Sequence, residues 1–298
     1  MKSYTQLRNE FGTDTKNSSA TNLAWGDTLM NDWIRRLTSQ ADWAFLHRLR
    51  TANTVADTAF VNLPYDVSRV DSVFVTVSDV RYSPKSVPTR EIWDRLNSRG
   101  ETSDIPEYFY IYNGQIGLFP TPVTADNVIS INAKISVPDL VVADITDTTI
   151  TTLANGSTAL TVSAGLTAQM AGFYIRPTLS STANTGDGRW YEISSVTNAT
   201  TAVLVREYGG VSITAGTAVC TISQMPAIPE EFHQLPEIYA SYRYWLKENE
   251  LSRANEFKSM LDRGSDDLFR AYASNTENYV LDDGEDDNFI NHNLTISL

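Results

Sequence analysis

The chain has 298 residues, of which 42% are hydrophobic, and its 36 Asp and Glu outnumber its 23 Lys and Arg to give a net charge of −13. This length suits about two domains of ordinary size. No apolar run approaches the roughly 18 to 20 residues that cross a bilayer, and the polar segment 1–12 lacks the apolar stretch of a secretory signal. We therefore expect a cytosolic protein without membrane contact.

An acidic chain gains nothing from counterion release at DNA phosphates, so the charge indicates solubility or a surface that repels DNA.

Helical and strand patterns succeed one another in the first 137 residues. Between about 19 and 40, apolar residues such as Met30, Trp33 and Leu37 recur every three or four positions, which predicts an amphipathic helix. The pair Asn113-Gly114 between two alternating segments is the strongest short signal for a β hairpin. The helices expected in this part are 4–11, 19–40 and 90–97, and the expected strands are 58–63, 70–77, 108–112, 115–119 and 128–135.

The character of the sequence changes near Pro138 and changes back near Pro226. Residues 139–224 are rich in Thr, Ser, Ala, Val and Gly, carry frequent turn signals and lack a helical period. Many short strands at such spacing predict a small sandwich or barrel. The strands expected there are 159–162, 173–176, 190–196, 201–205 and 217–222. Two helices are expected afterwards, at about 236–248 and 250–274, with Pro236 in the first turn.

These patterns predict an α+β fold: a helical frame with a β hairpin and short strands, interrupted by an all-β sandwich or barrel insert. The expected domains are the frame (1–137 and 226–275), the insert (138–225) and an acidic, extended C-terminal tail (276–298). The tail has no Lys or Arg, and its acids lack the spacing of an EF-hand, so we interpret it as a solvated, repelling segment. Its clustered acids are Asp282, Asp283, Glu285, Asp286 and Asp287.

The sequence predicts no catalytic residue, metal site or cofactor, and we do not expect an enzyme. His47, His233 and His292 lie far apart without companion ligands, and no glycine-rich phosphate loop is present. A cell-wall hydrolase, the alternative enzyme, would need paired carboxylates, and no pair can be nominated. Cys220 lies in a strand pattern without a basic neighbour, so we expect a buried hydrophobe rather than a nucleophile. The aromatic residues of the insert either fill its core or form a platform for a glycan: Tyr174, Trp190, Tyr191 and Tyr208.

Three segments carry a resemblance to a known family. An early helix leads into the aromatic stretch Trp33–Leu46, the hairpin runs from Tyr112 to Pro122, and Ile228–Phe232 opens a helical stretch rich in Tyr and Ala. In this order, the segments resemble the tailed-phage head-to-tail adaptor proteins, the connector family that includes the tail tubular proteins. The resemblance covers roughly residues 1–137 and 226–275.

The resemblance implies a structural subunit of the phage neck, present in the virion and assembled in the host cytoplasm. It would form a homo-oligomeric ring, usually of twelve subunits, that joins the portal protein to downstream neck or tail proteins and lets DNA pass without specific binding. The alternative is a tail-associated binding module whose insert contacts a glycan or another virion protein.

The resemblance also implies that the C-terminal segment reaches the portal. A terminal strand with free backbone groups can be completed by strand addition to a partner. The residues expected to dock on the portal are Phe289, Ile290, Leu294, Ile296 and Leu298. A closed ring also needs a head-to-tail interface between subunits. Candidates for that interface, with the core of one chain as the alternative, are Trp25, Trp43, Tyr242 and Trp245.

Overall fold

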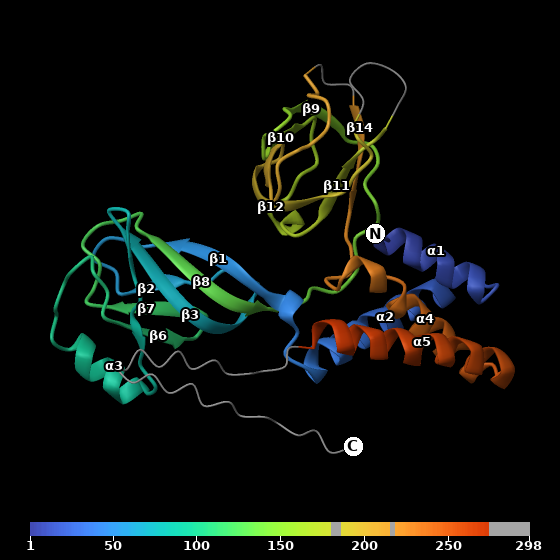
Figure 1. Ribbon diagram of the computed structural model, residues 1–298, viewed down its shortest axis with the longest axis horizontal. Helices are drawn as coiled ribbons and strands as arrows, with labels where there is room; N and C mark the ends of the chain where they lie inside the picture. Colours follow the sequence, from blue (N-terminus) through green and yellow to red (C-terminus); the bar gives the residue numbers. More distant parts are fainter. Residues whose placement is uncertain (180–185, 215–217, 274–298) are drawn as a thin grey trace, which may run out of the picture.

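Three bodies make up the computed structural model, which describes residues 1–179, 186–214 and 218–273. They are a helical bundle, a β body of two sheets and a closed β barrel (Figure 1). The barrel and the β body both project from the end of the bundle at which α2 leads into the β body. The expected fold class is confirmed, and the insert is a barrel rather than a sandwich.

The bundle joins both ends of the described chain. Ser3 caps the first helix in a capping box with Gln6, and Ser19 caps the second, so polar side chains satisfy the free N–H groups that begin each helix. A Cβ on Gly26 would lie 2.4 Å from Cε1 of Phe11, so the first two helices approach closely at a residue without a side chain. The four helices are α1 (Tyr4–Asp14), α2 (Ala20–Gln40), α4 (Leu235–Lys247) and α5 (Leu251–Tyr272).

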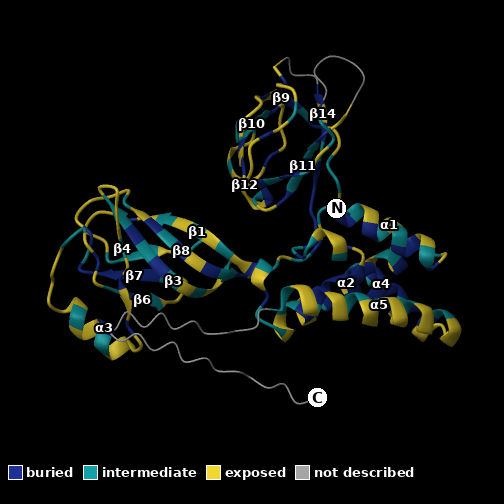
Figure 2. Ribbon diagram, in the orientation of Figure 1, coloured by how far each residue is buried: buried dark blue, intermediate teal, exposed yellow. Residues whose placement is uncertain are grey.

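Helix α4 is the centre of the bundle, since it packs against the other three helices. Helix α5 covers one side of it and leaves its own outer side exposed (Figure 2). Gly264 of α5 lies where a Cβ would be 2.5 Å from Cδ2 of Leu235. The glycine therefore permits the close contact between α4 and α5.

The β body packs two four-stranded sheets against each other, with a core of alternating residues such as Ile129 and Ile131 of β8. One sheet has the order β1-β8-β3-β4 and the other β2-β7-β6-β5. Trp93 of helix α3 (Arg90–Asn97) packs on the second sheet, with its ring 5.7 Å from that of Tyr110. The strands are β1 (His47–Asn53), β2 (Phe60–Asn62), β3 (Val67–Val77), β4 (Val80–Tyr82), β5 (Lys85–Ser86), β6 (Tyr108–Tyr112), β7 (Gln115–Phe119) and β8 (Val128–Ile135).

The barrel closes in the order β10-β13-β12-β11-β14-β9, so it has no free sheet edge. Cys220 points into its core and is fully buried, and burial raises the pKa of this thiol to about 12. The expectation of an inert, buried cysteine is therefore confirmed. The strands are β9 (Thr149–Leu153), β10 (Ala159–Val162), β11 (Tyr174–Pro177), β12 (Tyr191–Asn198), β13 (Thr201–Leu204) and β14 (Ala218–Ser223).

Glu237 is the carboxylic acid buried most deeply in the bundle. It lies on α4, is 4% exposed and accepts a hydrogen bond of 2.7 Å from Oγ of Ser241. Burial, together with the nearby carboxylates of Asp14 and Glu10, raises the pKa of Glu237 to about 8. The folded protein therefore prefers the protonated acid at neutral pH.

This preference makes bundle stability depend on pH. In the unfolded chain Glu237 ionises near its ordinary pKa of 4.5, so the folded protein binds more protons and the free energy of unfolding falls as pH rises from about 4.5 to 8. We expect Glu237→Gln, which cannot ionise, to remove about 2–4 kcal/mol of this fall. Urea unfolding at pH 5 and pH 8 measures it, with Glu256→Gln on the exposed side of α5 as the control. If the free energy of unfolding of Glu237→Gln fell between pH 5 and pH 8 as much as that of the unchanged protein, Glu237 would not be the group responsible.

Candidate functional site

Two chain crossings join the barrel to the rest of the molecule, and two buried amides hold them. The side chain of Asn31 donates to the carbonyl of Leu140 (3.1 Å) and accepts from its N–H (2.7 Å). Oε1 of Gln224 accepts from the N–H groups of Val141 (2.8 Å) and Val142 (3.0 Å), while its Nε2 donates to the carbonyl of Asp139 (2.6 Å). We call Asn31, Gln224 and the backbone of 139–142 the crossing cluster. It fixes the entering and leaving segments of the barrel to each other and to α2.

The start of α1 lies against the crossing cluster. The N–H of Tyr4 donates to the carbonyl of Gln224 (2.9 Å), and Oγ of Ser3 donates to Oδ2 of Asp144 (2.9 Å). The N–H of Asp144 donates in turn to Oγ1 of Thr5 (2.8 Å). The first turn of the protein therefore anchors the segment that enters the barrel.

An ionic joint attaches the bundle to the β body. Asp42 lies just after α2. Its carboxylate forms ion pairs with Nη2 of Arg69 (2.8 Å), Nζ of Lys134 (3.1 Å) and Nε2 of His47 (3.1 Å). Asp71 binds the other ring nitrogen of His47 (2.7 Å) and Nε of Arg69 (2.9 Å). Hydrogen bonds from Arg69, and then from Lys134 and His47, hold the pKa of Asp42 well below its usual range.

A third contact joins the barrel to the β body. The guanidinium of Arg48 on β1 pairs with Glu192 on β12, and both side chains are largely buried. The hydroxyl of Tyr65 lies 3.5 Å from the carbonyl of Ala171 near the same place. Arg48 occupies an inward position of its strand, so its charge would be costly there without Glu192.

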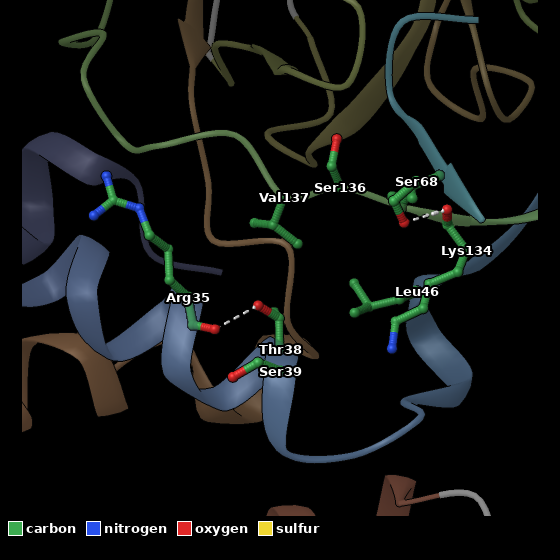
Figure 3. Close-up of a pocket in the computed structure, with 9 residues that line it drawn as sticks. Arg35, Thr38, Ser39, Leu46, Ser68, Lys134, Ser136 and Val137 are labelled. Carbon is green, nitrogen blue, oxygen red and sulfur yellow. Dashed lines mark hydrogen bonds between the residues drawn. The ribbon is translucent and has the colours of Figure 1, made fainter. Parts of the chain in front are cut away.

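A groove of about 270 Å³ lies at the junction of the bundle and the β body (Figure 3). Residues of α2 form one wall, and residues around the ends of β3 and β8 form the other. Its two cations are already occupied, Arg35 by Asp139 (2.5 Å) and Lys134 by Asp42. The remaining lining mixes hydroxyls with aliphatic groups: Thr38, Ser39, Leu46, Ser68, Ile135, Ser136 and Val137. This mixture suits contact with a protein chain.

The structure separates the four aromatic residues that the sequence nominates for subunit contacts. Trp43 is fully buried in the bundle core, where Nε1 donates to the carbonyl of Leu37 (2.6 Å), and Trp245 is also buried. Trp25 and Tyr242 are half-buried, and Nζ of Lys247 lies 4.8 Å from the ring centroid of Trp25. An interface role stays a prediction for all four, with Trp25 and Tyr242 the accessible pair. The nominated portal-docking residues and tail acids lie outside the described residues.

The aromatic residues of the barrel do not form one shared surface. Tyr191 and Tyr208 are buried in the barrel core, with ring centroids 5.4 Å apart. Tyr174 faces Glu192, and Trp190 lies under the guanidinium of Arg176 at 4.7 Å. The arrangement therefore gives little support to a glycan platform.

Among the described residues, no group of three or more His, Cys, Asp or Glu is arranged to hold a metal ion. No helix in the described ranges is long and apolar enough to cross a bilayer.

The crossing cluster and the ionic joint are the functional features that the sequence did not predict. Their residues belong to segments that meet only after folding: Asn31 and Leu140 are 109 residues apart, and Asp42 and Lys134 are 92 apart. The one local signal is Gln224, a polar residue placed between an apolar strand and Pro226.

Removing the charge of Asp42 tests the ionic joint. The lowered pKa of Asp42 contributes stability above the ordinary pKa near 3.8, and this contribution is lost as pH falls through the lower, folded-state pKa. We expect Asp42→Asn to lower the free energy of unfolding at pH 7 by about 1–3 kcal/mol and to weaken acid sensitivity below pH 4.

Asp32→Asn is the matched control, since Asp32 forms an exposed pair with Arg35 within α2. Thermal unfolding from pH 2.5 to 7 measures both variants. If the two variants lost stability equally at every pH, Asp42 would contribute no more than an exposed ion pair.

Comparison with known proteins assigns the family. The family model described as SU10 adaptor protein matches residues 2–281. No curated protein matches the chain at the threshold of significance. The match spans the bundle, the β body and the barrel together, and so accounts for the insert as well as the frame. The chain belongs to the SU10 adaptor protein family, which is a family of phage structural adaptors.

Proposed function

We propose that this protein is a subunit of a homo-oligomeric ring, of about twelve copies, that joins the portal to downstream neck or tail proteins and lets DNA pass. The observation that carries the proposal is the adaptor family match over residues 2–281. The crossing cluster, the ionic joint and the Arg48–Glu192 pair support it, because they hold the three bodies together, and a ring subunit needs a fixed arrangement of its parts. The proposed domains, 1–137 with 226–275 and 138–225, are supported by barrel strands that begin at Thr149 and end at Ser223.

The distribution of charge supports passage of DNA without binding. Residues 274–298 contain six acids and no Lys or Arg, so they contribute −6 of the net −13. Of the cations in the folded bodies, Arg35, Arg48, Arg50 and Arg69 are each paired with a carboxylate. Paired cations release few counterions from DNA, so a DNA-facing wall of this kind does not retain it.

Electron microscopy of the purified full-length protein, alone and mixed with its portal, tests the proposal. We expect closed rings that stack on portal particles along a shared axis. A protein that stays monomeric at micromolar concentration and does not attach to the portal would overturn it.

Two Trp variants sharpen the test. Trp25→Ala removes a half-exposed side chain and is expected to reduce ring formation while thermal stability changes little. Trp43→Ala removes a buried ring and is expected to cost about 3–5 kcal/mol of stability. Rings that form normally from Trp25→Ala would exclude Trp25 from the interface.

A further inference from the structure

Strand β1 is a long sheet edge whose outer side has no strand partner among the described residues. It pairs on one side with β8 through all seven residues, and no described strand pairs with its other side. The N–H of Thr54 donates to Asn127 across the same ladder, so the N–H groups of residues 49, 51 and 53 point away from β8. The other edge strands are short, with three residues in β2 and β4 and two in β5, and the barrel is closed. The outer side of β3 at 67–74 also lacks a strand partner, but the register of β3 with β8 shifts twice.

β1 has one of the features that usually protect an edge, inward-pointing charged residues, and lacks several others. It contains no Pro and no Lys, and its register with β8 is continuous, without a bulge. Its two arginines lie on the inward face and are neutralised by Glu192 and Asp66. The outward face includes Leu49, which is 57% exposed. An open, regular edge with an exposed apolar residue is suited to accept another strand.

The position of Ala273 indicates which segment can reach such an edge. Ala273 forms an antiparallel bridge to Trp43, four residues before β1 begins, so the described chain ends beside the base of β1. The 25 residues from 274 to 298 can span up to roughly 80 Å when extended. This reach is long enough to include the β1 edge of a neighbouring copy in a ring.

The C-terminal sequence matches this edge in length and pattern. The segment formed by the last seven residues, 292–298, has the same length as β1. Leu294, Ile296 and Leu298 alternate with Thr295 and Ser297, as in a strand with one apolar face. An added strand with its apolar face beside Leu49 would cover that exposed side chain.

We propose that residues 292–298 of one copy add as a fifth strand to the β1 edge of a second copy. The contact joins two different surfaces and is therefore head-to-tail, as a closed ring requires. The inference rests on the proposed ring. Portal docking of the same residues would use the same backbone groups, so one tail cannot make both contacts at once.

Cysteine cross-linking of the full-length protein tests the pairing. The single native cysteine, Cys220, is fully buried and does not interfere. Thr51→Cys places a thiol on the outward face of β1, and Leu294→Cys, Ile296→Cys and Leu298→Cys place one on the apolar face of the tail. When a Thr51→Cys protein is mixed with a tail variant and oxidised, we expect a covalent dimer that neither protein forms alone.

Two controls match these positions. Thr295→Cys lies on the opposite face of the tail segment, and Val80→Cys lies on β4, the other edge of the same sheet; both are expected to lower the dimer yield at least fivefold. Thr51→Pro removes an outward N–H, which an edge strand tolerates, and should abolish ring contacts to the same extent as deletion of 292–298. Its far-ultraviolet circular dichroism is expected to match that of the unchanged protein.

Each other outcome overturns the inference. A cross-link within a chain carrying both cysteines, but none in the mixture, would place the strand on its own β1. Rings seen by microscopy without any cross-link would reject strand addition while leaving the proposed ring intact. Cross-links of equal yield through Val80→Cys would show contact without a specific edge.

Discussion

The hydrogen bonds of Asn31 and Gln224 to the backbone of residues 139–142 are the interaction on which the rest of the structure depends. A barrel inserted into a chain must enter and leave through two segments that belong to no sheet or helix. Their backbone groups are buried or partly buried at the junction, and each buried group without a partner costs about 1–3 kcal/mol. The two amides satisfy several of these groups at once and thereby fix where the barrel starts.

The other joints work outward from this cluster. The first turn of α1 closes over it, the Asp42 joint sets the β body against the bundle, and Arg48 with Glu192 sets the barrel against the β body. These contacts are polar and partly exposed, whereas each body has its own apolar core. The molecule therefore consists of three bodies, each with its own apolar core, held together by directional polar bonds.

Local chemistry made much of the fold predictable. Asn113 and Gly114 adopt φ of 50° and 72°, the left-handed pair that a tight hairpin needs, and the predicted strands on both sides match the structure. Helix α3 and strand β8 also have the predicted bounds.

Strand β1 was missed because its inward positions hold Arg48 and Arg50, which only the distant Glu192 and Asp66 make tolerable. The junction was missed for the same reason, since no local pattern marks an amide that binds a segment about a hundred residues away.

Hydrogen exchange of the backbone amides of Val141 and Val142 tests the central claim most directly, in the unchanged protein and in Gln224→Met. Methionine keeps the approximate volume of the side chain and removes its hydrogen bonds. We predict exchange at these two amides that is faster by tenfold or more, with the barrel and bundle cores still protected. Unchanged protection of Val141 and Val142 in Gln224→Met would contradict it.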